Sequence, residues 1–138
     1  MKFYKIIDHT ADMRIEVSGR SEKELFANAA AAIFDLLCDP EQVKVRMTRT
    51  LIVAGMDRVD LLINFLREVL YLFNGENLLI KKFSVTILNG NSITAEARGE
   101  PFDPGRHAIK MEIKAVTYHQ AEIKKTREGW RARVIFDV

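Results

Sequence analysis

The chain has 138 residues, of which 48% are hydrophobic and 29% are charged, and its 21 basic and 19 acidic residues leave a formal net charge of +2. These values are typical of one soluble globular domain over residues 1–138, and they argue against disorder. The small net charge excludes a global field that would draw the protein onto nucleic acid or a membrane.

No segment predicts a membrane span or a secretory leader. The longest strongly apolar stretch, residues 61–73, is interrupted by Asn64, Arg67 and Glu68 and is too short to cross a bilayer. The single cysteine, Cys38, cannot form an internal disulfide, which agrees with a reducing compartment. We therefore expect a cytoplasmic protein with no membrane contact.

The first predicted elements are two strands, at residues 3–7 and 13–17. The second strand alternates between apolar and polar residues, which assigns one set to the buried face: Met13, Ile15 and Val17. Asp12 then lies on the opposite, outward face, together with Arg14 and Glu16.

A helix is predicted next, at about residues 21–38. Ser21 and Glu24 have the spacing of a capping box, in which each side chain satisfies a free amide at the helix start. We expect the helix to end near Cys38, because Pro40 disfavours a helical conformation in the residue before it.

A second helix is predicted at about residues 57–74, with Asp57 as its N-cap and Gly75 as its stop. Its apolar stripe is so broad that the helix must be largely buried. The stripe consists of Leu61, Leu62, Phe65, Leu66, Val69, Leu70 and Phe73.

The remaining predicted elements are strands, at residues 43–54, 78–88, 92–98, 110–125 and 130–138. Asn-Gly and Glu-Gly pairs supply hairpin turns within this part of the chain. The fold class is therefore α+β: a single domain of mostly antiparallel sheet with the two helices packed on it.

The last predicted strand has two faces. Alternation assigns one set of its residues to the core: Trp130, Ala132, Val134 and Phe136. It assigns the other set to the opposite face: Arg131, Arg133, Ile135 and Asp137.

The run Asp8-His9-Thr10-Ala11-Asp12 brings two carboxylates, an imidazole and a hydroxyl together near the start of the chain. Asp8 is more simply interpreted as a turn-forming residue than as part of a site, and His9 is more simply interpreted as a structural histidine. Asp12 lies at the exit of the loop on the polar side of a strand, where a metal ion, a partner or solvent would each be compatible with it.

Oxygen donors dominate the chemistry that the two chain ends could support. The three histidines and Cys38 lack the close paired spacing of zinc ligands. Asp12, Asp137 and the main-chain carboxylate of Val138 would instead suit a hard cation such as Ca²⁺ or Mg²⁺. The sequence alone does not place the two aspartates near each other. It contains no Gly-rich phosphate loop, nucleophile elbow or partnered cysteine, so a self-sufficient enzyme is not favoured.

Basic residues are more frequent in the C-terminal third, where acidic residues are mixed among them. A solvated sheet face explains this pattern more simply than an RNA-binding surface does. The basic residues that an RNA-binding surface would use are Lys110, Lys114, Lys124, Arg131 and Arg133.

Three segments of the sequence resemble the archease family. They are residues 4–12 around Asp-His-Thr-Ala-Asp, residues 112–119 (Glu-Ile-Lys-Ala-Val-Thr-Tyr-His) and residues 129–138 (Gly-Trp-Arg-Ala-Arg-Val-Ile-Phe-Asp-Val). Archeases are small cytoplasmic proteins that assist the GTP-dependent RNA-splicing ligase of the RtcB type, which joins tRNA halves. The resemblance implies a protein that helps this ligase to load its active-site histidine with GMP and to turn over repeatedly. Such a protein is not itself an enzyme and contacts RNA only indirectly.

The resemblance also implies a divalent cation near the chain ends, with Ca²⁺ expected first and Mg²⁺ or Mn²⁺ as alternatives. Its expected ligands are Asp12, Asp137 and Val138. The residues expected to shape the motif are Asp8, His9 and Thr10. The residues expected to contact the ligase or its nucleotide are Lys114 and His119.

Two other functions stay open on the sequence. An older proposal gives some family members a chaperone-like role toward a tRNA cytosine methyltransferase. The same carboxylates would also serve a stand-alone metal-dependent hydrolase, although the sequence shows no obvious general base for one.

Overall fold

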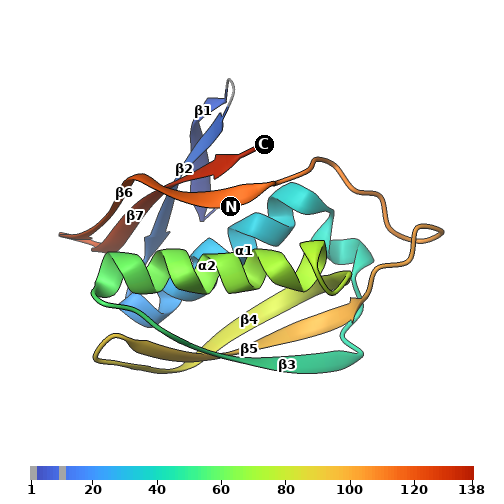
Figure 1. The fold of residues 1–138 in the computed structure, drawn as a ribbon, viewed down its shortest axis with the longest axis horizontal. Coiled ribbons are helices and arrows are strands. Elements are labelled where there is room, and N and C mark those ends of the chain that lie inside the picture. Colours follow the sequence, from blue (N-terminus) through green and yellow to red (C-terminus); the bar gives the residue numbers. More distant parts are fainter. Residues whose placement is uncertain (1–2, 10–11) are drawn as a thin grey trace.

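Strands and helices cover most of the protein in the computed structural model, which describes residues 3–9 and 12–138 (Figure 1). In chain order the elements are β1 (Tyr4–His9), β2 (Asp12–Gly19), α1 (Glu22–Leu37), a 3₁₀ helix (Pro40–Gln42), β3 (Met47–Ala54), α2 (Arg58–Asn74), β4 (Leu78–Asn89), β5 (Ser92–Pro101), β6 (Ala115–Thr126) and β7 (Gly129–Asp137). Within those described ranges, no helix is long and apolar enough to span a bilayer.

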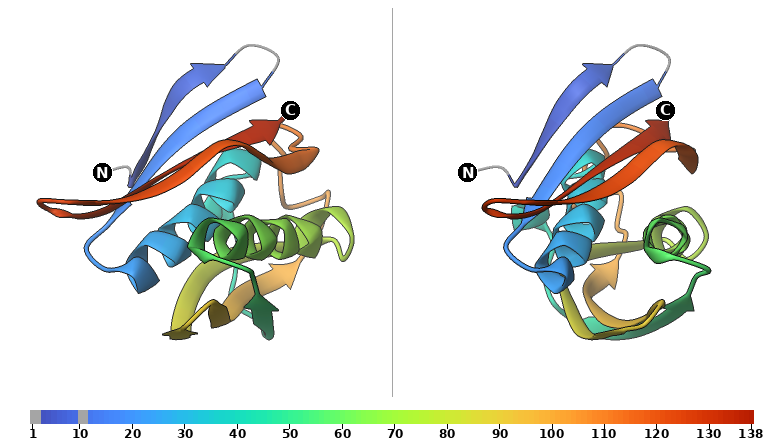
Figure 2. Two further views of the ribbon diagram at one scale, coloured as in Figure 1. Left: turned by 60° about the vertical axis from the view of Figure 1, so that its left-hand side comes forward. Right: turned by 90° about the vertical axis from the view of Figure 1, so that its left-hand side faces the viewer.

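The elements form three layers, with the two helices between two antiparallel sheets (Figures 1 and 2). One layer is a four-stranded sheet in the order β1-β2-β7-β6, and the opposite layer is a three-stranded sheet in the order β3-β5-β4. Helix α1 packs against β2 and β4, and α2 packs against β6 and β3. The predicted α+β class is confirmed, with the helices covered by a sheet on both sides.

Both helices begin and end where their capping residues predict. The Ser21 hydroxyl accepts a hydrogen bond from the Glu24 amide at 3.1 Å, and Cys38 follows the last residue of α1. The Glu24 carboxylate accepts from the Arg20 amide at 3.2 Å, one residue earlier than a standard capping box requires. Helix α2 is capped by Asp57 and stops at Gly75.

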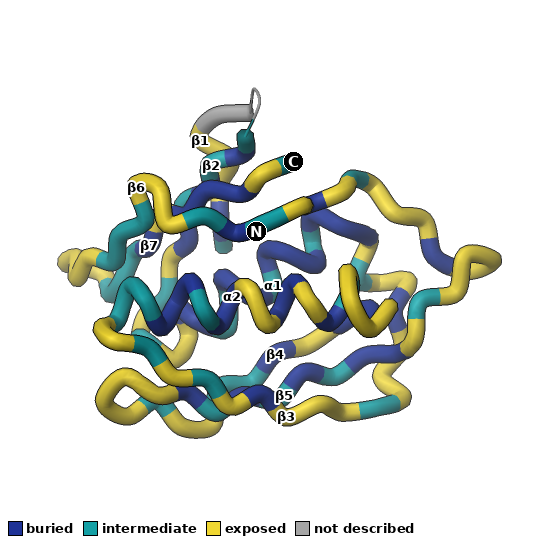
Figure 3. The backbone as a smooth tube through the Cα atoms, in the orientation of Figure 1, coloured by how far each residue is buried: buried dark blue, intermediate teal, exposed yellow. Residues whose placement is uncertain are grey.

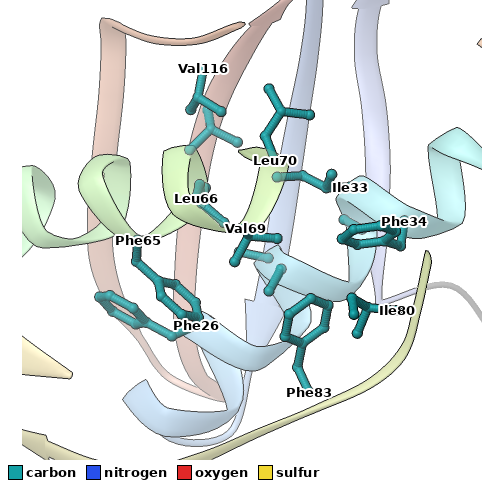
Figure 4. Packing of buried hydrophobic residues seen from close by; sticks show 14 of the residues in the cluster. Phe26, Ile33, Phe34, Phe65, Leu66, Val69, Leu70, Ile80, Phe83 and Val116 are labelled. Atoms are coloured by element: carbon teal, nitrogen blue, oxygen red, sulfur yellow. The ribbon is translucent and has the colours of Figure 1, made fainter. Parts of the chain in front are cut away.

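The hydrophobic core lies between the layers, where buried residues gather along the backbone (Figure 3) and side chains from the helices pack against the sheets (Figure 4). The rings of Phe26 on α1 and Phe65 on α2 have centroids 6.1 Å apart, and Phe34 on α1 lies 5.8 Å from Phe83 on β4. Burying a side chain of this size contributes about 1.5–3 kcal/mol. The predicted stripe of α2 is buried, apart from Phe73, which is half-buried.

Two predicted strands start too early. Residues 43–46 precede β3 without joining it, because the Lys44 amide donates to the Glu100 carboxylate at 2.7 Å instead of to a sheet partner. Residues 110–114 likewise precede β6, and the Lys110 amide donates to the Leu37 carbonyl at the end of α1 at 2.7 Å. These segments have a strand-like composition, but they meet a neighbouring strand at their last residues, where the Arg46 amide donates to the Gly99 carbonyl and the Lys114 amide to the Asp137 carbonyl.

Candidate functional site

Asp12 and Asp137 are direct partners in the four-stranded sheet. Antiparallel pairing of β2 with β7 sets Asp12 opposite Asp137 and Met13 opposite Phe136. Met13 and Phe136 are buried on the helix side, so the two carboxylates share the outer face. Figure 2 shows the C-terminus beside the start of β2. The structure therefore brings together two residues from opposite ends of the sequence.

The surroundings of the pair leave both carboxylates accessible. Asp137 is exposed, and the Asp12 side chain is 32% exposed with its Oδ1 at 3.9 Å from Arg14 Nε. Like charges at directly opposed positions repel each other unless a cation lies between them. The Arg14 guanidinium supplies one positive charge beside Asp12, and a cation between the two carboxylates would reduce their repulsion further.

The main chain around Asp137 is held on both sides. Ala115 of β6 is its register partner, and the Lys114 amide donates to its carbonyl at 2.7 Å. Val138 is half-buried and packs against the core. This anchoring fixes the direction in which the Val138 main chain leaves the sheet.

The two residues expected to contact a partner lie at different distances along β6 from the pair. Lys114 is exposed and immediately precedes the residue that pairs with Asp137. His119 is also exposed, but it lies in an irregular part of β6, between the pairs Thr117–Ile135 and Glu122–Arg133. The structure thus places the main chain of Lys114, just before β6, next to that of Asp137, and His119 farther along, within β6.

The remaining residues of the opening motif are only partly described. In β1, Asp8 pairs with Arg14 and His9 pairs with Met13 in the backbone register. The side chains of these two residues, and Thr10 as a whole, lie outside the described residues. Their expected role in shaping the motif stays a prediction.

The donors at the pair fit a hard, partly hydrated cation. Over residues 3–9 and 12–138, no group of three or more His, Cys, Asp or Glu side chains could hold a metal ion. A cation at the pair would have the carboxylates of Asp12 and Asp137 as its described side-chain ligands, with a main-chain oxygen of Val138 as the expected addition. Ca²⁺ and Mg²⁺ accept carboxylate and main-chain oxygens and complete their shells with water.

Cys38 and His107, two of the residues considered for a zinc site, have other roles in the structure. Burial raises the pKa of the Cys38 thiol to about 11, so the thiolate that zinc requires is disfavoured. His107 uses both ring nitrogens, because Nδ1 accepts from the Asp103 amide at 2.9 Å and Nε2 lies 2.9 Å from the Glu100 carboxylate.

One residue of β7 differs from the sequence prediction. Ile135 lies on the outer face, as alternation indicates, but it is only 4% exposed. Arg14 of β2 and Thr117 of β6 flank it in register, and the Arg14 guanidinium donates to the Gln120 side chain at 2.6 Å. The outer face therefore carries a covered apolar position next to the carboxylate pair. The sequence does not predict the burial of Ile135. It depends on the irregular part of β6 that brings Gln120 close, and no characteristic residue pattern marks that irregularity.

The chain is similar to known archeases along its whole length. The model of the Archease protein family matches residues 4–138. A Methanosarcina barkeri archease is 39% identical over 141 residues, covering 99% of this chain and 97% of the relative. A Pyrococcus abyssi archease is 37% identical over 142 residues, covering all of both chains.

Two solved structures share the fold. The solution structure of protein 1598 from Methanobacterium thermoautotrophicum has a TM-score of 0.86 at 35% identity over the whole of both chains. The crystal structure of a Thermotoga maritima archease, described as a possible chaperone, has a TM-score of 0.65 at 21% identity, covering 97% of this chain and 96% of that one. At that identity the second likeness supports the fold alone. The resemblance of the three sequence segments is thus confirmed, and the chain belongs to the Archease protein family.

Proposed function

We propose that this protein is a non-catalytic, metal-binding cofactor of an RNA ligase of the RtcB type, acting in tRNA splicing. In this role it promotes loading of the ligase with GMP and allows repeated turnover. Family membership supports the class of protein, and the direct pairing of Asp12 with Asp137 is the observation that carries the metal-binding part.

The paired carboxylates have the position that such a role requires. They lie at the end of two strands, on the outer face of the sheet and beside the C-terminus, so a partner can approach them without unfolding any element. A divalent ion held there would neutralise charge on phosphate oxygens during nucleotidyl transfer. The chain's own contribution is to hold the two carboxylates at a fixed separation, through the rigid β2–β7 ladder and the Lys114 amide.

Exposed side chains along β6 supply contacts to the ligase in this proposal. Lys114 would meet an anionic group of the ligase or its nucleotide, because it is an exposed lysine whose main chain lies next to that of Asp137. His119 would contact the ligase farther from the ion. RNA would be contacted through the ligase only, and a role with a tRNA methyltransferase stays a prediction.

Calcium titration of the purified protein tests the metal site directly. We expect one Ca²⁺ per chain, and we expect Asp12→Asn and Asp137→Asn each to weaken binding by roughly tenfold or more, because each removes one of two charged ligands. The matched control is Asp39→Asn, which alters an aspartate at the start of the 3₁₀ helix and preserves its capping ability.

A multiple-turnover ligation assay with the RtcB-type ligase then tests the function. The two site variants should fail to stimulate the ligase, whereas Asp39→Asn should stimulate it like the unaltered protein. Full stimulation by both site variants would refute the proposal. Turnover of a phosphoester by the protein alone, with Mg²⁺ or Mn²⁺ and no ligase, would support a hydrolase instead.

A further inference from the structure

Strand β1 forms one edge of the four-stranded sheet, and its pairing shows which main-chain groups face that edge. The Ser18 amide donates to the Phe3 carbonyl at 3.1 Å, and the same register continues to the pair Ile6–Ile15. In an antiparallel ladder only alternate residues bond to the neighbouring strand, so Lys5 bonds toward β2 as Phe3 does. The N–H and C=O groups of Ile6 therefore point away from β2, to the open edge.

At each of the three other sheet edges, a side chain from a helix donates to a carbonyl of the edge strand. These bonds are Arg67 to Val116 of β6 at 3.1 Å, Asn64 to Ala54 of β3 at 3.1 Å, and Lys23 to Thr86 of β4 at 3.2 Å. Covering an edge in this way hinders another chain from pairing with it. No side chain of the described residues bonds to the main chain of Ile6, so the β1 edge has no comparable cover there.

The β1 edge also exposes apolar side chains on both faces of the sheet. Ile6 lies on the helix side, like its partner Ile15, but it is 45% exposed, because β1 and the start of β2 extend away from the helices (Figures 1 and 2). Ile7 is 47% exposed and lies toward the outer face, where it lines a shallow hollow with Ile135. Two adjacent exposed isoleucines on an open edge strand are typical of a surface that another strand covers.

Lys5 adds positive charge to the β1 edge. Its side chain is 71% exposed, and its Nζ lies 3.4 Å from Glu16 Oε1. The other Glu16 oxygen lies 3.1 Å from Arg133 Nε and 3.9 Å from Arg131 Nε. Three cations thus surround one carboxylate, although Arg133 also lies 3.8 Å from Glu122. A carboxylate on a strand added beside Lys5 would balance the excess positive charge.

The β1–β2 hairpin connects the β1 edge with the carboxylate pair. Ile6 pairs with Ile15, which is three residues along β2 from Asp12 and therefore about 10 Å away along the strand. A standard protein interface covers about 800 Å² on each partner, which is roughly 30 Å across. One partner that docks over Asp12 and Asp137 can therefore also reach Ile6.

We propose that the β1 edge receives an extended segment of the partner protein, which pairs with Ile6 as an added strand of the sheet. The segment carries apolar residues beside Ile6 and Ile7 and an acidic residue beside Lys5. The inference rests on the proposed function, since the partner is the ligase, and it assigns a second contact apart from the metal ion. The bulge at Ile7 ends the regular part of the edge, so the added strand is short and supplements the contact at the carboxylate pair.

Hydrogen exchange of main-chain amides, measured on the protein alone and with saturating ligase, tests the proposal. The Lys5 amide bonds within the ladder and should exchange slowly in both states. The Ile6 amide should exchange at least about tenfold more slowly in the complex, because it gains a hydrogen bond there. Ile52 on β3 is the matched control. It is 74% exposed, and the bond from the Gly55 amide to the Asn91 carbonyl sets a register in which the Ile52 amide also points away from its neighbouring strand.

Proline substitutions test the same edge by removing one amide each. Ile6→Pro removes an N–H that the ladder does not use, so it should leave Ca²⁺ binding unchanged but weaken ligase binding by roughly tenfold. Ile52→Pro makes the matched change at the edge of the other sheet and should bind the ligase like the unaltered protein. Ile7→Asp keeps every amide and places a charge where an apolar neighbour is expected. It should also weaken ligase binding, which keeps the proposal testable if Ile6→Pro does not fold.

Three results would overturn the proposal, and they differ in what they say of the proposed function. An Ile6 amide that exchanges equally fast in the free protein and in a complex that ligates RNA repeatedly would refute the added strand alone. Slower Ile6 exchange on concentrating the protein without ligase would assign the edge to a second copy of this chain. Absence of ligase binding by the Ca²⁺-loaded protein would refute the proposed function and, with it, the partner assigned to this edge.

Discussion

Glu100 and His107 form a buried hydrogen bond, with 2.9 Å between Oε2 and Nε2. His107 Nδ1 accepts a hydrogen bond from the Asp103 amide, so the ring proton is on Nε2 and is donated to the carboxylate. Arg106 donates to both carboxylate oxygens, at 2.9 and 2.8 Å. This cluster fixes the segment after β5 onto the body of the protein.

We expect Glu100→Gln to lower the free energy of unfolding clearly. The substituted amide would direct N–H donors at Arg106 or at the Lys44 amide, which are donors themselves. Glu96→Gln is the control on the same strand, because Glu96 forms only a partly exposed ion pair with Arg98. Urea unfolding of both variants checks the prediction, which fails if their midpoints shift equally.

Stability should also depend on pH through Glu100. Hydrogen bonds from Arg106 chiefly, and then from the Lys44 amide and His107, hold the pKa of this carboxyl well below its usual range, despite its burial. Because the pKa is lower in the folded state, the stabilisation is complete above the unfolded value of about 4.3 and is lost as the pH falls below it. Unfolding midpoints measured from pH 6 to pH 2 should therefore fall less steeply for Glu100→Gln than for the unaltered protein. Parallel curves would contradict this assignment.

The helix caps make a separate contribution to stability. Ser21→Ala and Asp57→Ala should each lower the free energy of unfolding by about 1 kcal/mol, because each leaves a first-turn amide without its acceptor. Ser92→Ala, at an exposed strand start, should change it little. Thermal unfolding of the three variants compares them, and a loss at Ser92 as large as at the caps would argue against the capping explanation.

Gly99 allows two strands to approach each other closely. A Cβ at this position would lie 1.9 Å from the Leu79 carbonyl oxygen, which belongs to the backbone and cannot move aside. We expect Gly99→Ala to destabilise the protein by about 1–3 kcal/mol or more. Gly105→Ala should cost much less, since its nearest neighbour is the Asp103 side chain at 3.3 Å. Chemical denaturation distinguishes them, and equal costs would refute the steric argument.

Local patterns predict the parts of this fold that depend on neighbours in sequence. The caps at Ser21 and Asp57 and the alternation of β2 are local, and the structure has them as predicted. The start of β3 is not local, because it depends on Lys44 meeting Glu100, a residue of another strand. Composition alone therefore extends that strand too far.

The candidate site likewise has some features that local sequence patterns predict and others that depend on contacts between distant strands. Alternation predicts that Asp12 faces outward, but its pairing with Asp137 depends on β7 inserting beside β2, which is a matter of strand order. The burial of Ile135 depends on two bulges in other strands. No pattern near Ile135 indicates either bulge, so periodicity predicts its face correctly but does not predict its burial.

The two sheets are built from different parts of the chain, and this affects the order in which they can fold during synthesis. All four strands of one sheet come from residues 4–19 and 115–137, whereas the other sheet comes from residues 47–101. During synthesis, the β2 edge of the first hairpin therefore stays unpaired until the last strand arrives to lie against it. Contacts between such distant segments form slowly. We expect the three-stranded sheet and the helices to assemble first, and the layer with the carboxylate pair to close last.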